Sequence, residues 1–282
     1  MDAAAFLKED LGHGDITSDA LIGDVDAEAM IFAKEDCILA GLEEAKAIFD
    51  HLGVETETDL RDGQRIGKFT KVTLLKGKAK AILAGERVAL NFLMRMSGIA
   101  TETRELTNKC REKNPNVSVA ATRKTTPGFR FFEKKAVMLG GGDPHRFRLD
   151  DAFLIKDNHL KVVGSVKEAV KRAKAVHFNK KVEVEVETEE EALEAAQAGA
   201  DIIMLDNIPP DAGRSVAGKI REISSCTIEV SGGINPRNIV EYADYADVIS
   251  LGWITHSVRA IDFSLEIKEL SKKGLLERAT RT

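Results

Sequence analysis

The sequence after Asn114 and Pro115 alternates short apolar runs with amphipathic segments in a regular order. The apolar runs are Val117–Ala121, Ala152–Ile155, Val182–Val186, Ile202–Leu205, Thr227–Val230 and Val248–Leu251. Segments with helical periodicity lie between them, at Ser165–Val176, Glu189–Ala198 and Pro236–Tyr242. Buried parallel strands separated by helices produce this pattern, which restricts this part of the chain to an α/β barrel or an open parallel sheet. Of the two, we favour the barrel.

The first part of the chain, to about Arg95, has no such regularity. Its expected elements are a strand at Ala27–Ala33, a helix at Leu42–Leu52 and two strands at Lys71–Leu75 and Lys78–Leu83. A longer helical pattern runs from about Glu86 to Cys110 and is interrupted near Ser97 and Gly98. This mixture predicts a small α+β domain.

The length of 282 residues is typical of one large domain with a smaller companion. We place an N-terminal α+β domain with its connecting helix at 1–112 and the α/β barrel domain at 113–260. We expect residues 261–282 to form a C-terminal helix that packs back on the N-terminal domain.

Composition argues against several classes of protein. No apolar run approaches the roughly 20 residues that span a bilayer, and the Met1-Asp2 start lacks the pattern of a secretory signal. We therefore expect a cytoplasmic protein with no membrane partner. Cys37, Cys110 and Cys226 are far apart and form no CxxC pair, so neither a disulfide framework nor a structural zinc site is expected.

The formal net charge of −5 disfavours nonspecific nucleic-acid binding, because phosphate neutralisation needs a basic face. Residues 119–149 reverse this balance, with seven basic residues against two acidic ones. The basic residues are Arg123, Lys124, Arg130, Lys134, Lys135, Arg146 and Arg148. A concentrated basic segment in an acidic chain indicates a small anionic ligand. For Lys134 and Lys135 we prefer a different interpretation, a solvated helix face.

Every predicted strand of the second part ends in ionisable or glycine-rich sequence. These strand ends are Thr122–Lys124, Lys156–Asn158, Glu185–Glu187, Asp206–Asn207, Ser231–Gly233 and Gly252–Trp253. In α/β barrels the loops at the carboxyl ends of the strands converge on one mouth, where active sites form. A scaffold that only binds or supports does not need such a ring, so we favour an enzyme over a binding scaffold.

The sequence SGGINP, from Ser231 to Pro236, follows a predicted strand and is expected to open a helix with Asn235 as its N-cap. Backbone N–H groups at such a helix start, aided by the helix dipole, can hold a phosphate. Gly252 at the next strand end allows close backbone approach, and the last strands of a barrel are its usual phosphate site. The alternative is a tight turn without a ligand.

Glu183, Glu185 and Glu187 alternate along one predicted strand, so they point to the same side. Three carboxylates in a dry interior need cations. Glu185 and the strand-end Asp206 are therefore candidate ligands of a Mg²⁺ held mainly by diphosphate. Glu183 or Glu187 could instead pair with lysines at the barrel mouth.

The histidines show no spacing typical of a transition-metal site. His145 lies in the basic segment, where it could hydrogen-bond a carboxylate. We expect surface positions for His51 and His177, and supporting or structural roles for His159 and His256.

Three blocks of this sequence are distinctive: TRKTTPGFR from Thr122 to Arg130, GGGDPHR from Gly140 to Arg146 and LIKDNH from Leu154 to His159. They resemble the signature blocks of quinolinate phosphoribosyltransferases. EDLGHGDIT from Glu9 to Thr17, ERVALNFL from Glu86 to Leu93, and the late SGGIN and LGWITHS are similar to that family too. The blocks follow in order over nearly the whole chain, which argues against chance similarity.

The resemblance implies a type II phosphoribosyltransferase fold, in which an N-terminal α+β sandwich-like domain accompanies an incomplete (open) α/β barrel. It implies a pentosyltransferase that converts quinolinate and phosphoribosyl pyrophosphate into nicotinate mononucleotide, carbon dioxide and diphosphate for NAD biosynthesis. It also implies a homodimer, sometimes assembled further, in which one subunit's N-terminal domain closes the barrel of the other.

The resemblance also implies roles for individual residues. Arg87 would reach into the neighbouring site, and Arg123, His145, Arg146 and Lys156, with Thr122 beside them, would bind quinolinate. Lys124, Glu185 and Asp206 would handle the phosphoribosyl donor and its magnesium, and Ser231, Gly232, Gly233 and Gly252 would hold the 5-phosphate. The catalytic set is Lys124, Lys156, Glu185 and Asp206. The arginines suit this substrate, because forked guanidinium groups match planar carboxylates.

Two positions depart from the family pattern. Pro144 stands where Asn is expected, and Arg148, which could add phosphate affinity or be solvated, stands where Gly is expected. A relative that acts on nicotinate, or one associated with molybdenum transport, is therefore an alternative, although the intact LIKDNH block argues against both. A noncatalytic metabolite-binding protein would have lost part of the catalytic set, and a sugar-phosphate isomerase would not need the arginines.

Overall fold

The computed structural model describes residues 1–268, which divide into two compact units. One unit comprises Met1–Thr101 and the residues from Arg259 onward, and the other comprises Glu102–Val258. The sequence predicts this boundary at 112/113. The division falls instead within the continuous helix α4 (Ala79–Arg111), so no linker marks it in the sequence.

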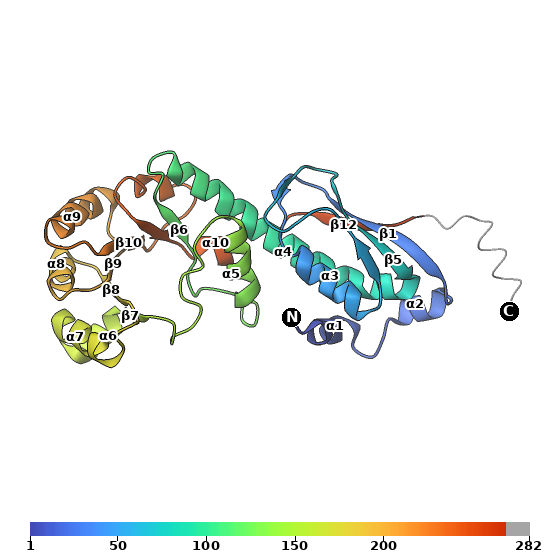
Figure 1. Cartoon of the computed structure of the whole chain (residues 1–282), viewed down its shortest axis with the longest axis horizontal. Coiled ribbons are helices and arrows are strands. Elements are labelled where there is room, and N and C mark those ends of the chain that lie inside the picture. The colour runs from blue at the N-terminus through green and yellow to red at the C-terminus, as the bar shows by residue number, and fades with distance from the viewer. Residues whose placement is uncertain (269–282) are drawn as a thin grey trace, which may run out of the picture. The chain divides into compact units, whose positions relative to one another are not determined.

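The second unit is built on a six-stranded sheet of parallel strands, which Figure 1 shows. Its strands are β6 (Ser118–Ala120), β7 (Phe153–Ile155), β8 (Val182–Val186), β9 (Ile202–Asp206), β10 (Thr227–Ser231) and β11 (Val248–Ser250). The order is β6-β11-β10-β9-β8-β7, so the first strand pairs with the last and the ring stays open between β6 and β7. This arrangement confirms the open α/β barrel, and each predicted apolar run agrees with one strand to within one residue at either end.

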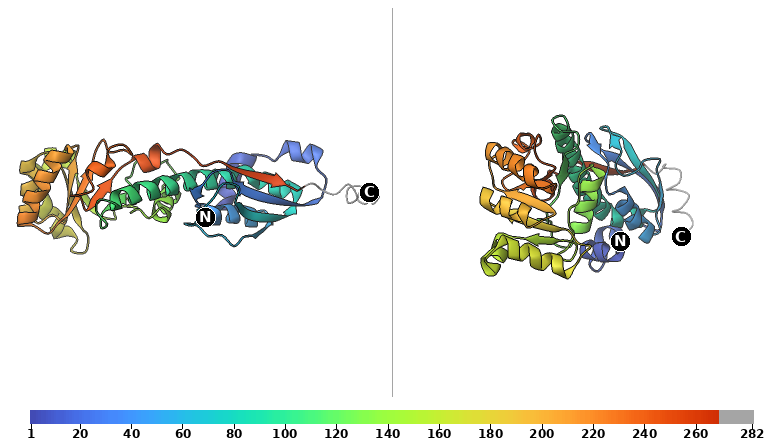
Figure 2. Two further views of the ribbon diagram at one scale, coloured as in Figure 1. Left: turned by 90° about the horizontal axis from the view of Figure 1, so that it is seen from above. Right: turned by 60° about the vertical axis from the view of Figure 1, so that its left-hand side comes forward.

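Helices cover the outer face of this sheet (Figure 2). They are α6 (Asp157–Val163), α7 (Val166–Val176), α8 (Glu189–Gln197) and α9 (Pro210–Ile223), with α5 (Arg130–Leu139) and the short α10 (Trp253–His256) elsewhere in the unit. The side chains of Ser165 and Thr188 cap α7 and α8 by accepting from backbone N–H groups of the first turn. Short loops connect these helices to the strands, so the carboxyl ends of the strands gather on one side of the unit.

The first unit contains an antiparallel four-stranded sheet in the order β12-β1-β5-β3, with a separate pair formed by β2 and β4. These strands are β1 (Asp26–Ala33), β2 (Cys37–Ile38), β3 (Glu55–Glu57), β4 (Arg65–Ile66), β5 (Lys71–Lys78) and β12 (Phe263–Ile267). Its helices are α1 (Ala3–Leu11), α2 (Ile16–Leu21), α3 (Leu42–His51) and the first part of α4. The α+β prediction for this part of the chain is thus confirmed.

Two predictions for α4 are wrong. The expected strand Lys78–Leu83 belongs to the helix from Ala79 onward, because a short apolar run rich in Ala and Leu suits either structure. The helix also passes through Ser97 and Gly98 without a break. A Cβ on Gly98 would lie 2.3 Å from the carbonyl oxygen of Arg259, so glycine is required here for close packing.

The prediction of a C-terminal helix is wrong for the part of it that the structure describes. Phe263–Ile267 forms β12, which pairs antiparallel with β1. Its alternating apolar residues, Phe263, Leu265 and Ile267, have the period of a strand. The rest of that prediction, residues 269–282, lies outside the described residues.

The expected helix Pro236–Tyr242 is reduced to one 3₁₀ turn, η1 (Ile239–Glu241). Two asparagine side chains bond to the local backbone instead: Asn238 accepts from Asn235 N–H, and Asn235 accepts from Arg237 N–H. Such bonds compete with helix formation.

Among residues 1–268, no helix combines the length and hydropathy needed to cross a bilayer.

Candidate active site

Two adjoining cavities lie at the carboxyl ends of the barrel strands. One, of about 400 Å³, is lined by charged side chains from five strand ends and the loop before β7. The other, of about 690 Å³, is lined by the loops that follow β10 and β11. Thr122, Lys124, Ser231 and Ser250 line both cavities, so these residues connect the two.

Twelve of the thirteen predicted site residues line these cavities. The charged cavity holds Thr122, Arg123, Lys124, His145, Arg146, Lys156, Glu185, Asp206 and Ser231, and the loop cavity adds Gly232, Gly233 and Gly252. Arg87 does not line either cavity; it is exposed on α4 in the first unit. The structure therefore assembles the predicted set around one opening, while the role of each residue stays a prediction.

Lys156 and Glu185 form an ion pair between the ends of neighbouring strands β7 and β8. The Glu185 side chain is 13% exposed and that of Lys156 is 41% exposed. His159 fixes the backbone of Lys156, because the backbone N–H of Lys156 donates to Nδ1 of His159 at 2.9 Å. His159 thus has the supporting position expected for it.

The three alternating glutamates of β8 have three different environments. Glu183 is buried, Glu185 is partly buried, and Glu187 lies beyond the strand end and is exposed. The expectation that Glu183 could pair with a lysine is wrong, because this carboxylate pairs with His145.

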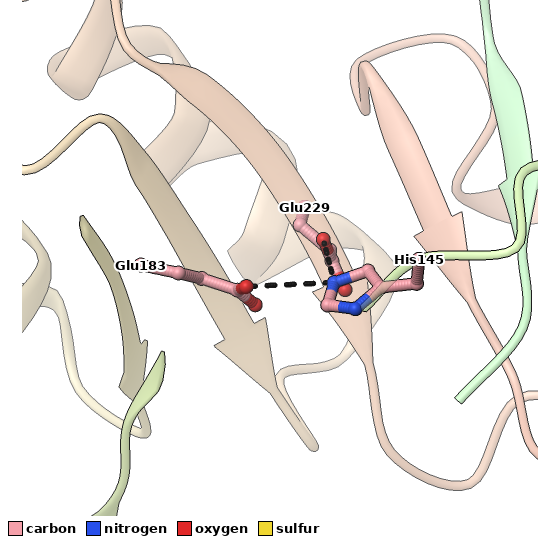
Figure 3. A group of neighbouring side chains, drawn as sticks. All are labelled: His145, Glu183 and Glu229. Carbon is pink, nitrogen blue, oxygen red and sulfur yellow. Dashed lines mark ion pairs between the residues drawn. The ribbon is translucent and has the colours of Figure 1, made fainter. Parts of the chain in front are cut away.

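His145 lies between two buried carboxylates, as Figure 3 shows. Its Nε2 is 3.4 Å from a carboxylate oxygen of Glu183 on β8 and 3.4 Å from one of Glu229 on β10. Burial alone would lower the pKa of His145, but its hydrogen bonds to Glu183 and Glu229 outweigh burial and raise the pKa to about 10. Burial raises the pKa of Glu183 despite the histidine. His145 is therefore a cation at neutral pH.

Lys134 fixes the loop that carries His145, and the prediction that it lies on a solvated face is wrong. Its side chain is fully buried, and Nζ donates to the carbonyl oxygens of Pro144 and Arg146. Burial, with Arg130 nearby, lowers the pKa of Lys134 to about 8. An ammonium group can be buried here because backbone carbonyls accept its protons.

Arg123 and Arg146 both line the charged cavity. Arg146 donates to the carbonyl oxygen of Ala152 at 3.2 Å. Burial, followed by the charge of Arg123, lowers the pKa of Arg146. Nε of Arg123 is buried without a hydrogen-bond partner. A buried cationic donor that lacks an acceptor indicates an anionic ligand.

The glycine-rich loop after β10 has the backbone conformation that only glycine readily adopts. Gly232 and Gly233 have φ angles of +88° and +64°. A Cβ on Gly232 would lie 2.4 Å from Oδ1 of Asn207, and one on Gly252 would lie 2.8 Å from Nε2 of His256. The loop after β10 leads into a 3₁₀ turn and not into the predicted α-helix, so loop N–H groups and nearby cations would hold a phosphate on this side of the cavity.

Sequence reasoning missed several residues of the site. Glu229 and Ser250 line the charged cavity, and Arg237 lines the loop cavity together with Trp253 from a predicted strand end and His256, which was expected in a supporting role. A signal existed for Glu229, since a carboxylate inside an apolar strand requires a cation.

The two departures from the family pattern differ in position. Pro144 lies in the loop that Lys134 fixes, and its backbone carbonyl accepts a hydrogen bond from Nζ of Lys134. Any residue at this position would supply the same carbonyl. Arg148 is 72% exposed, pairs with Asp150 and lines neither cavity. Of the two interpretations offered for Arg148, added phosphate affinity and a solvated side chain, the structure supports the solvated side chain.

The comparisons with known families agree with this geometry. Residues 15–97 match the N-terminal domain of quinolinate phosphoribosyl transferases, and residues 99–266 match the C-terminal domain. The chain belongs to the quinolinate phosphoribosyltransferase family. This confirms the resemblance drawn from the sequence blocks.

Similar proteins cover nearly the whole chain. A probable nicotinate-nucleotide pyrophosphorylase [carboxylating] of Archaeoglobus fulgidus is 47% identical over 90% of this chain and 98% of its own length. The corresponding protein of Rattus norvegicus is 38% identical over 94% of this chain and 89% of its own. The solved nicotinate-nucleotide pyrophosphorylase of Francisella tularensis superposes with a TM-score of 0.89 at 38% identity, covering 94% of each chain.

Proposed function

We propose that this protein is a quinolinate phosphoribosyltransferase that acts in NAD biosynthesis. It joins quinolinate to phosphoribosyl pyrophosphate and releases diphosphate and carbon dioxide, leaving nicotinate mononucleotide. The observation that carries this proposal is the joined pair of cavities, one lined by cations and one by a glycine-rich loop, connected through Lys124 and Ser231. The family relationship points to the same reaction.

The charged cavity suits a pyridine with two adjacent carboxylates. Arg123, Arg146, His145 and Lys156 supply positive charge from separate elements around it. The buried Nε of Arg123 gives one donor ready for a carboxylate oxygen. Nicotinate has a single carboxylate and would leave part of this set unpaired, which favours quinolinate.

The loop cavity suits the 5-phosphate of the donor. Gly232 and Gly233 let backbone N–H groups line the opening, and Lys124 reaches the same cavity from the β6 side. The hydroxyl of Thr255 donates to the carbonyl of Lys124 at 2.7 Å and fixes its backbone beside the loop.

Magnesium belongs to this proposal as the partner of diphosphate. The donor set fits, because Glu185 and Asp206 offer the carboxylate oxygens that Mg²⁺ prefers and line the same cavity. Two carboxylates are few for a dedicated metal site, so diphosphate would provide the remaining ligands. When bound, the ion would neutralise charge on the leaving diphosphate.

The residues of the chain then contribute mainly by position and charge. They hold the pyridine nitrogen facing C1 of the ribosyl group, so that the N–C bond forms as the C–O bond to diphosphate breaks. The pyridinium then loses its 2-carboxylate as carbon dioxide, and the positive nitrogen stabilises the electron pair left on the ring until that carbon takes a proton. Arg123, Arg146 and Lys156 remain to bind the other carboxylate.

The proposal includes a cytoplasmic homodimer with shared sites, as the family resemblance implies, in which Arg87 of one subunit completes the site of the other. The defining experiment incubates the protein with phosphoribosyl pyrophosphate, Mg²⁺ and either quinolinate or nicotinate. We expect nicotinate mononucleotide and carbon dioxide from quinolinate. Nucleotide formed from nicotinate alone would move the assignment to a related activity.

A further inference from the structure

Glu183 and Glu229 are buried carboxylates that the proposed reaction does not use directly. They lie on β8 and β10, with β9 between them, and are 2% and 1% exposed. A carboxylate in such a place needs hydrogen bonds and an opposite charge. His145 is the cation that contacts both, through the single atom Nε2.

This geometry fixes how the imidazole is used. A proton on Nε2 shared by two carboxylates leaves Nδ1 as the ring nitrogen that can bond to a ligand in the cavity. The loop that carries His145 is fixed as well. His145 has a φ of +50°, its backbone N–H donates to Asp143, and Lys134 binds the carbonyls on either side.

We propose that Glu183 and Glu229 are positioning residues that hold the His145 ring by Nε2–H, so that Nδ1–H donates to a carboxylate of the pyridine substrate. This inference rests on the proposed function. In this role the two glutamates act on the substrate through His145. Their negative charges favour the doubly protonated ring, the only form in which Nδ1 can donate while Nε2 is held. The raised pKa of His145 agrees with this form.

The kinetic test compares Glu229→Gln and Glu183→Gln with Glu44→Gln, which alters a buried glutamate of the first unit. Glutamine keeps the shape but removes the negative charge. We expect KM for quinolinate to rise about tenfold or more in the first two variants, as for a lost charge-assisted hydrogen bond. KM for phosphoribosyl pyrophosphate should stay within about twofold, as should both constants in the control.

A double-mutant comparison separates positioning from general support. In a His145→Gln background, Glu229→Gln should raise KM for quinolinate no further, because its effect passes through the ring. An additive further rise, or an unchanged KM in the single variant, would overturn the inference. If the wild-type protein does not convert quinolinate at all, the proposed function fails. The nitrogen-15 spectrum of the wild-type protein, described next, then tests by itself how the His145 ring is held.

Nitrogen-15 spectra of the ring give a readout that does not depend on turnover. At pH 7.5 the wild-type protein should show both nitrogens of His145 protonated, and Glu229→Gln should shift them toward the neutral ring. One protonated nitrogen in the wild type would contradict the inference, and this holds even if a variant does not fold. Tight stoichiometric zinc binding that Glu229→Gln abolishes would also overturn it, since the cluster would then be a metal site.

Discussion

The ion pair between Lys156 and Glu185 joins the predicted substrate-binding cations to the predicted magnesium ligands across neighbouring strands β7 and β8. In the absence of ligands, each of these charges is balanced by the other. Both side chains line the charged cavity, and among residues 1–268 neither forms a second ion pair.

Replacing Lys156 by Ala should therefore lower kcat/KM by about 100-fold or more, because it removes a preorganised cation from the site. The unfolding temperature should change little, since the lysine is partly exposed. The matched control is Lys161→Ala, which removes a more exposed lysine from an ion pair with Asp157 on α6. Near-normal turnover of Lys156→Ala would refute its role.

Gly232→Ala should reduce both stability and donor binding. The new Cβ would lie 2.4 Å from Oδ1 of Asn207 at a φ of +88°, so the loop must shift at a cost of about 1–3 kcal/mol. We expect KM for phosphoribosyl pyrophosphate to rise more than KM for quinolinate. Gly218→Ala in α9, where nothing lies within 4 Å, should instead stabilise the protein by up to about 1 kcal/mol in urea unfolding. Equal effects of the two changes would contradict this account of the loop.

The barrel could be predicted from sequence because its strands are buried on both faces and read as continuous apolar runs. Val182–Val186 shows the limits of that signal, since its glutamates are compatible with a strand but not with a dry core. The cation that resolves this, His145, comes from a loop far away in the sequence. Local patterns carry no information about such a pairing.

Two of the failed predictions have their origin in contacts between elements. The glycine at position 98 does not interrupt the helix; it leaves room for the carbonyl oxygen of Arg259, which lies where a Cβ would be. Lys134 is buried because carbonyls of the loop that follows its own helix accept its protons. The helix expected at Pro236–Tyr242 fails for a local reason, because asparagine side chains bond the loop backbone within two or three residues.

Removing divalent cations should abolish activity without unfolding the protein. Glu185 and Asp206 alone bind Mg²⁺ weakly, so the chelated protein should keep its unfolding temperature when no substrate is present. Added Mg²⁺ should restore turnover, and Asp206→Asn should raise the Mg²⁺ concentration needed for half-maximal rate. Full activity in the presence of excess chelator would exclude the proposed metal.

The stability contributed by His145 should depend on pH in a defined direction. Its pKa in the folded protein, about 10, is above the ordinary value of 6.5, so the folded state keeps the proton to higher pH. The contribution is then fully present below pH 6.5 and is lost as the pH rises through about 10. The facing groups are Glu183 from β8 and Glu229 from β10, with Arg146 adjacent in the chain.

The measurement is the difference in unfolding free energy between wild type and His145→Gln at several pH values. This difference should shrink steadily between pH 7 and pH 10. A difference that does not change over this range would show that the ring is not held as a cation.

Shared active sites can be tested by mixing two inactive variants. Arg87 lies on α4 outside both cavities, whereas Lys156 lines the charged one. If Arg87 completes the neighbouring subunit's site, a dimer of one Arg87→Ala and one Lys156→Ala chain contains one intact site and one doubly altered site. Random pairing makes half of the dimers mixed, so refolding an equal mixture should recover about a quarter of wild-type activity.

The control is each variant refolded alone, which should stay inactive. If Arg87 serves its own subunit, no mixed dimer contains an intact site, and the mixture would be no more active than the separate variants. Light scattering on the same samples establishes whether dimers form at all, so a monomeric wild type would refute the shared site directly.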